Sequence, residues 1–265
     1  MTLYDTIELE VSEAEGYSIL YLNRPEQLNA VNRQLCLDFV SAIKAVSKNE
    51  AVRCVVLSAK GPAFCAGGDL AEFQKAKDPG AFLHELAMIF HVGIGILKEM
   101  NAPSIAAING ACFGVGFSLA CACDIRICAQ KAKFSVAFTN IGLSPDSSLT
   151  YHLPRLIGLP LANEMVLLNK VLNSKDALEN RLVSKVYGND ECLLEGAKKL
   201  ATKISRGPTL AFGSTKRLFL NSYKNNLQAH LEEELKSVSK MAYTEDFKEG
   251  VSSFFEKRRP NYKGR

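Results

Sequence analysis

Short strands that alternate with helices are the sequence feature that most constrains how this chain folds. Residues 53–58 (RCVVLS), 104–108 (SIAAI) and 124–128 (DIRIC) are mostly apolar runs with the length of buried strands. Helical sequence separates them, over about residues 81–100 and 117–122. Because this alternation is typical of parallel sheets covered by helices, we predict the α/β fold class.

The N-terminal part of the chain predicts a hairpin and a helix. Residues 6–11 and 17–22 are strand-like and are separated by a turn at Gly16. Asn32 is in position to cap a helix over residues 33–47. These elements extend the predicted α/β unit to the N-terminal end.

The C-terminal quarter predicts a different, helical region. Residues 191–259 have the pattern of consecutive helices, with breaks at 206–208 and near 243–244. We therefore divide the chain into a core, residues 1–197, and a C-terminal helical region, residues 198–265. Apolar helix faces in this second region would leave water by packing on the core or on a neighbouring subunit.

Composition and charge restrict the possible partners. A formal net charge of +4 does not indicate general binding to nucleic acid or to membranes. No uninterrupted apolar run reaches about 18 residues, and the first ten residues do not resemble an export signal, so we expect a cytoplasmic protein. The eight cysteines lie mostly in apolar stretches and lack the spacing of zinc ligands, so we expect reduced thiols and no metal site.

Two glycine-rich loops are the main candidates for a functional site. Residues 64–70 (FCAGGDL) and 109–116 (NGACFGVG) each follow a predicted strand and precede a helix. Glycine lets the backbone approach a ligand closely, and the first turn of a helix has unpaired N–H groups. Two such loops that converge on one oxygen would form an oxyanion hole, although the same spacing also suits ordinary strand-to-helix turns. Neither loop has the glycine spacing of a nucleotide-phosphate motif.

Several motifs resemble those of the crotonase (enoyl-CoA hydratase/isomerase) family. Residues 64–70 are similar to that family's F-x-A-G-x-D-[LI] motif, and residues 105–124 (IAAINGACFGVGFSLACACD) are similar to its second signature. Residues 22–30 (LNRPEQLNA) resemble its early loop, and residues 246–260 (DFKEGVSSFFEKRRP) resemble its C-terminal pattern. The resemblance therefore extends over nearly the whole chain.

The resemblance implies a fold, a substrate class and a set of site residues. The fold would be a spiral of ββα units with a C-terminal helical region that mediates trimers or dimers of trimers. The substrate would be a coenzyme A thioester, with no covalently bound cofactor. The amides of Gly68 and Val115 would form the oxyanion hole, although the family usually has glycine where Val115 stands. The residues that would contact the substrate are Arg24, Gln27, Leu28, Ala66, Gly67, Asp69, Leu70, Gly114 and Phe138.

Departures from the family pattern indicate which reaction to expect. Where family hydratases have two water-site glutamates, this chain has Ser118 and Phe138, so hydration by paired carboxylates is not implied. Residues 142–155 (GLSPDSSLTYHLPR) instead resemble enoyl-CoA isomerases of the family, including the ring isomerases of the phenylacetate pathway. By that resemblance Asp146 is the single catalytic acid–base group. Its position after Pro145 also suits a helix cap.

Three other functions stay open at this point. An atypical site could still hydrate enoyl-CoA. Crotonase-type 4-chlorobenzoyl-CoA dehalogenases have an aspartate at the position of Asp146 and a histidine on the helix where His91 lies, but they also carry tryptophan in the pocket, and this chain has none. The chain could also be a non-catalytic protein that binds acyl-CoA on the same scaffold.

Overall fold

A computed structural model describes residues 4–265 and contains a six-stranded sheet with the order β1-β2-β3-β4-β6-β9. β1 pairs antiparallel with β2, which confirms the predicted hairpin, and every later neighbour in this sheet is parallel. The predicted α/β architecture is therefore present. The strands are β1 (Ile7–Ser12), β2 (Tyr17–Leu22), β3 (Cys54–Ala59), β4 (Ser104–Ile108), β6 (Ile125–Ala129) and β9 (Lys185–Tyr187).

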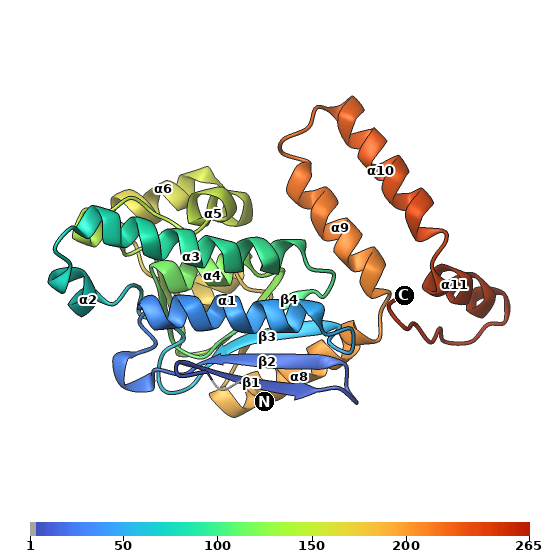
Figure 1. Cartoon of the computed structure of the whole chain (residues 1–265), viewed down its shortest axis with the longest axis horizontal. Coiled ribbons are helices and arrows are strands. Elements are labelled where there is room, and N and C mark those ends of the chain that lie inside the picture. The colour runs from blue at the N-terminus through green and yellow to red at the C-terminus, as the bar shows by residue number, and fades with distance from the viewer. Residues whose placement is uncertain (1–3) are drawn as a thin grey trace.

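Helices cover both faces of this sheet (Figure 1). Alternate residues of each strand point to opposite faces. Leu20, Val55 and Leu57 join a large buried cluster with α1, α3 and α4, whereas Ile19 and Val56 join a second cluster with α8. The central strands are therefore buried on both faces, which explains their apolar runs. These helices are α1 (Arg33–Lys48), α3 (Pro79–Glu99), α4 (Val115–Ala122) and α8 (Asp190–Ser205).

α1 and α3 pack along each other above the sheet (Figure 1). The cap predicted at Asn32 is confirmed, because its side chain accepts a hydrogen bond from the N–H of Leu35 at 2.9 Å. α3 has the length and apolar composition of a helix that could cross a membrane. In this structure, however, the ring of Phe90 packs against the ring of Phe39, and the two ring centroids are 5.0 Å apart. One face of α3 therefore packs in the core, while Met88 and Val92 on the helix are exposed.

A second, three-stranded sheet has no counterpart in the sequence pattern. It contains β5 (Ala111–Phe113), β7 (Lys133–Ser135) and β8 (Leu172–Asn173) in that order. Strands this short are below the length at which hydrophobic periodicity identifies a strand. The remaining short elements are η1 (Pro25–Gln27), α2 (Leu70–Lys75), η2 (Phe138–Ile141), α5 (Leu149–Ile157), α6 (Leu159–Leu167) and α7 (Ser174–Glu179).

The C-terminal helices leave the core only after α8. α8 packs against β3, β4 and β6, and it contains the boundary expected between residues 197 and 198. The separate helical region of the structure therefore begins with α9, and its first helices project away from the sheet (Figure 1). The segment between α9 and α10 is a further break that the sequence pattern did not predict. The helices of this region are α9 (Thr209–Asn221), α10 (Leu227–Met241) and α11 (Glu245–Phe255).

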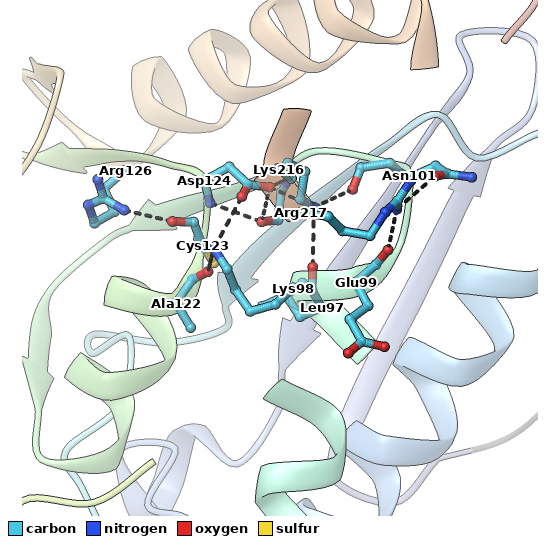
Figure 2. Close-up of polar contacts among 12 residues, drawn as sticks. Leu97, Lys98, Glu99, Asn101, Ala122, Cys123, Asp124, Arg126, Lys216 and Arg217 are labelled. Carbon is cyan, nitrogen blue, oxygen red and sulfur yellow. Dashed lines mark hydrogen bonds and ion pairs between the residues drawn. The ribbon is translucent and has the colours of Figure 1, made fainter. Parts of the chain in front are cut away.

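A largely buried polar cluster joins α9 to the core (Figure 2). Carboxylate oxygens of Asp124, just before β6, lie 2.9 Å from Nζ of Lys216 in α9 and 3.3 Å from Nζ of Lys98 in α3. The same carboxylate accepts hydrogen bonds from the N–H and the hydroxyl of Ser104, both at 2.8 Å. One carboxylate therefore connects the sheet, α3 and the C-terminal region.

Candidate active site

The two glycine loops lie side by side. The backbones of Cys65 and Cys112 pair as an isolated parallel β-bridge. The N–H of Cys65 donates to the carbonyl of Ala111 at 3.0 Å. Further along, a Cβ atom added to Gly114 would lie 3.2 Å from the Cα atom of Gly67. Gly67 and Gly114 both have positive φ angles, 113° and 54°, which disfavour a side chain at either position. Glycine is therefore required for the two backbones to approach so closely.

The two amides predicted to form an oxyanion hole belong to residues that line one cavity. Val115 is the first residue of α4, so its N–H has no acceptor within the helix. Gly68 directly precedes Asp69, the N-cap residue of α2. Among residues 4–265, neither amide donates to a backbone carbonyl. Two free N–H groups on one cavity are the parts that an oxyanion hole requires, and their role in catalysis stays a prediction.

The cavity has a volume of about 560 Å³ and a mostly apolar wall. Burial raises the pKa of the Cys36 thiol to about 12, so this sulfur is part of the wall and not a nucleophile. Apart from that thiol, the ionisable lining residues within the described chain are Asp146 and His84. No group of three metal-ligating side chains occurs among residues 4–265. Much of the apolar wall comes from Leu70, Phe73, Leu83, Leu86, Phe90 and Ile141.

Asp146 is held by hydrogen bonds to both its side chain and its backbone. Its Oδ1 atom lies 2.8 Å from Nε2 of His91, and its Oδ2 atom accepts a hydrogen bond from the hydroxyl of Ser147 at 3.1 Å. Its carbonyl oxygen accepts a hydrogen bond from the hydroxyl of Ser118 at 2.8 Å. The N-cap position of α5 belongs to Ser148, so Asp146 is not the helix cap. The side chain of Asp146 is 39% exposed, and Asp146 is one of the residues that line the cavity.

The backbone that follows Asp146 adopts an unfavourable conformation. Ser147 and Ser148 have φ angles of 54° and 68°, a region that residues other than glycine rarely adopt. Such conformations cost about 1–3 kcal/mol each and persist only where surrounding contacts determine them. They are concentrated at active sites, so this turn is consistent with a functional role for Asp146.

The structure brings most of the predicted site residues together, but not all of them. Those that line the cavity are Ala66, Gly67, Gly68, Leu70, Gly114, Val115, Phe138 and Asp146. Those outside its wall are Arg24, Gln27, Leu28 and Asp69. Arg24 and Asp69 pair with each other at 3.0 Å, with each side chain 14% exposed, and so attach the early loop to the first glycine loop. Any contact of these residues with a substrate stays a prediction.

Sequence reasoning did not identify the apolar wall or the pairing of His91 with Asp146. The wall residues of α2 and α3 have the spacing of any amphipathic helix. His91 and Asp146 are 55 residues apart in the chain, so no local pattern connects them. One available signal was the seven-residue spacing of His84 and His91, which places both on the same face of α3.

Comparison with known proteins identifies the family. Residues 13–265 match the family model described as enoyl-CoA hydratase/isomerase. The chain therefore belongs to the enoyl-CoA hydratase/isomerase family, which acts on coenzyme A thioesters. It is 34% identical to 2,3-dehydroadipyl-CoA hydratase of Escherichia coli strain K12, over 97% of this chain and 99% of the relative. It is 33% identical to 1,2-epoxyphenylacetyl-CoA isomerase of the same strain, over 98% and 100%.

Solved structures confirm the fold. A crystal structure of a protein of this family from Mycobacterium abscessus superimposes with a TM-score of 0.91 and is 35% identical, covering 98% of this chain and 100% of the other. The predicted crotonase fold, with an α/β core and a C-terminal helical region, is therefore confirmed. The relatives include a hydratase and an isomerase at nearly equal identity.

Proposed function

We propose that this protein is an enoyl-CoA isomerase, which moves a double bond of an acyl-CoA thioester from the Δ3 to the Δ2 position, or a ring isomerase that uses the same acid–base group. One observation carries this proposal. Among residues 4–265, Asp146 is the only carboxylate on the wall of the cavity to which Gly68 and Val115 contribute. One carboxylate is sufficient for isomerisation, because the group that removes the proton can also return it.

In the proposed reaction, the N–H groups of Gly68 and Val115 donate to the thioester carbonyl oxygen. Asp146 removes a proton from the α carbon, and the electron pair of that C–H bond forms an enolate on the carbonyl. The enolate electrons then shift the double bond toward the thioester, while Asp146 returns the proton to the γ carbon. Loss of one oxyanion-hole donor typically costs about 2.7–4 kcal/mol in the barrier, so the two amides would supply much of the catalysis.

Product analysis in labelled water tests this proposal. Incubation of the wild-type protein with 3-hexenoyl-CoA in H₂¹⁸O is expected to yield 2-hexenoyl-CoA without ¹⁸O. The physical reason is that Ser118 and Phe138 offer no carboxylates to activate a water molecule. Mass spectrometry of the products measures the result, with 1,2-epoxyphenylacetyl-CoA as a second substrate. Rapid formation of ¹⁸O-labelled 3-hydroxyhexanoyl-CoA from 2-hexenoyl-CoA, without conversion of 3-hexenoyl-CoA, would instead support a hydratase, because water adds only to a double bond conjugated with the thioester.

The contact between His91 and Asp146 favours one alternative function. In an aryl-CoA dehalogenase, a carboxylate displaces the halide and a histidine then activates water. The 2.8 Å separation of Oδ1 and Nε2 is compatible with that pair of roles. Chloride release from 4-chlorobenzoyl-CoA distinguishes the two functions. Release faster than isomerisation of 3-hexenoyl-CoA would replace the isomerase proposal.

The lining of the cavity also supports a proposal about the acyl group, namely that it is uncharged and apolar. Among residues 4–265, no lysine or arginine lines the cavity. An acyl chain that ends in a carboxylate, like the one named for the 2,3-dehydroadipyl-CoA relative, would bury its charge with no lysine or arginine beside it and only His84 as a basic group on the wall. Each methylene group that leaves water, by contrast, contributes about 0.8 kcal/mol to binding.

Hexanoyl-CoA is expected to bind at least about tenfold more tightly than adipoyl-CoA, a difference of about 1.4 kcal/mol. The two ligands have the same chain length and differ in a terminal methyl or carboxylate group. Both are saturated, so titration calorimetry measures binding independently of any isomerisation. Leu83→Arg should improve adipoyl-CoA binding, whereas Leu83→Met should not. Equal affinities of the wild-type protein for both ligands would contradict the proposal.

We further propose that the C-terminal helices associate with other copies of the chain. Large apolar side chains of α9 to α11 are exposed, and Phe254 and Phe255 are 77% and 78% accessible. Extended apolar surface of this kind marks an interaction site. A homotrimer or a dimer of trimers, as the family resemblance implies, would cover this surface.

A further inference from the structure

Ser118 lies where two parts of the proposed site meet. It is fully buried in α4, three residues after Val115. Its hydroxyl donates to the carbonyl oxygen of Asp146 at 2.8 Å, and it also lies 3.3 Å from the carbonyl oxygen of Gly114. This side chain therefore contacts both the residue that precedes an oxyanion-hole amide and the residue that carries the candidate base.

The hydrogen bond from Ser118 attaches α4 to the turn that carries Asp146. The turn continues through Ser147 and Ser148, whose positive φ angles are unfavourable. Among residues 4–265, no other hydrogen bond joins α4 to residues 143–148. α4 itself is well fixed, because all but its first residue are buried. The hydroxyl of Ser118 thus connects the unfavourable turn to a rigid helix.

We propose that Ser118 is a positioning residue, which holds the turn that carries Asp146 at a set distance from the oxyanion hole. This inference rests on the proposed isomerase function, because one carboxyl group must then reach both the α and the γ carbon of a single bound enolate. A displacement of about 1 Å can cost about 10²-fold in rate. The neutral hydroxyl provides the fixed geometry without adding a second charge beside the base.

Replacement of Ser118 by cysteine tests the proposal, since cysteine keeps nearly the same volume but is a weak hydrogen-bond donor. We expect Ser118→Cys to lower kcat for 3-hexenoyl-CoA by about 10- to 100-fold. The Kd for hexanoyl-CoA should change less than about threefold, because Asp146 acts on the reacting carbons and not on ground-state binding. A carboxyl that is less firmly held should also return more protons to the α carbon and fewer to the γ carbon. In D₂O, the amount of α-deuterated substrate recovered, divided by the amount of product formed, should therefore rise, and NMR measures both.

Ser205→Cys is the matched control. Ser205 is also a buried serine, the last residue of α8, and its hydroxyl oxygen lies 2.7 Å from the carbonyl oxygen of Glu15 and 2.9 Å from that of Thr202, so it can donate to either. Ser205 does not line the cavity, so this variant should lower only the thermal stability. Ser118→Ala repeats the test if the cysteine variant does not fold.

Three outcomes separate the two proposals. Suppose that the wild-type protein isomerises 3-hexenoyl-CoA. A folded Ser118→Cys or Ser118→Ala variant with the same kcat and the same exchange ratio as the wild type would then refute the role of Ser118 but not the proposed function. An equal fall of kcat in Ser205→Cys would show that the effect is general destabilisation, which also refutes that role. Absence of isomerisation in the wild type would refute the proposed function itself.

Discussion

Replacement of Asp146 by asparagine is expected to lower kcat for isomerisation of 3-hexenoyl-CoA by about 10²- to 10⁴-fold, the usual range for loss of a positioned acid–base group. Asparagine has nearly the same shape and can still interact with His91 and Ser147, but its amide cannot accept a proton from carbon. Binding of hexanoyl-CoA should change little. Steady-state kinetics and titration calorimetry measure the two effects.

Asp78→Asn is the control for this experiment. Asp78 is an exposed carboxylate that caps α3 by accepting a hydrogen bond from the N–H of Ala81 at 3.0 Å, and asparagine caps helices equally well. Asp78 does not line the cavity, so its replacement should leave kcat unchanged. An Asp146→Asn protein with wild-type turnover would eliminate Asp146 as the acid–base group and with it the proposed mechanism.

Replacement of Asp124 by asparagine is expected to reduce the free energy of unfolding by about 3–5 kcal/mol, because removal of one member of a buried ion pair leaves the others uncompensated. The side chains of Asp124, Lys98 and Lys216 are only 18%, 16% and 9% exposed. Urea unfolding, with native fluorescence or circular dichroism as the signal, measures the change. Since Lys216 belongs to α9, the C-terminal region should loosen from the core as well.

Asp190→Asn is the matched control for the buried cluster. Asp190 pairs with Lys131 at 2.7 Å, but the two side chains are 44% and 53% exposed. An exposed pair contributes about 0–1 kcal/mol, so this variant should change the free energy of unfolding only slightly. If Asp124→Asn and Asp190→Asn reduce the free energy of unfolding by similar amounts, burial is not the reason why Asp124 contributes to stability.

Acid should remove part of the stability that Asp124 provides. Burial by itself raises the pKa of this carboxyl, but the attraction of Lys216 and Lys98 and the hydrogen bonds from Lys216 and from the backbone N–H of Ser104 outweigh burial and hold the pKa below its ordinary value. A lowered folded-state pKa means that the contribution is complete above the unfolded value of about 3.9 and is lost as the pH falls further. In Asp124→Asn the free energy of unfolding should therefore fall less steeply than in the wild type as the pH is lowered below about 3.9.

Local patterns in the sequence predicted the regular elements of the core. Apolar runs, the cap at Asn32 and the turn at Gly16 each depend on residues close in the chain, so their positions follow from sterics and periodicity. The two glycine loops were identified for the same reason. The division expected after residue 197 lies within α8, because periodicity shows that these residues form a helix but not which surface the helix packs on.

The sequence by itself determined the α/β core, the helical C-terminal region, the two glycine loops and, through family motifs, Asp146 as the candidate base. Only the tertiary structure decided that Gly67 lies beside Gly114, that His91 contacts the Asp146 carboxyl and that Ser118 bonds to the Asp146 backbone. Ser118 and Asp146 are 28 residues apart, and each contact depends on how helices and loops pack on the sheet. Propensity and periodicity act over a few residues, whereas packing of separate elements sets the geometry of a site.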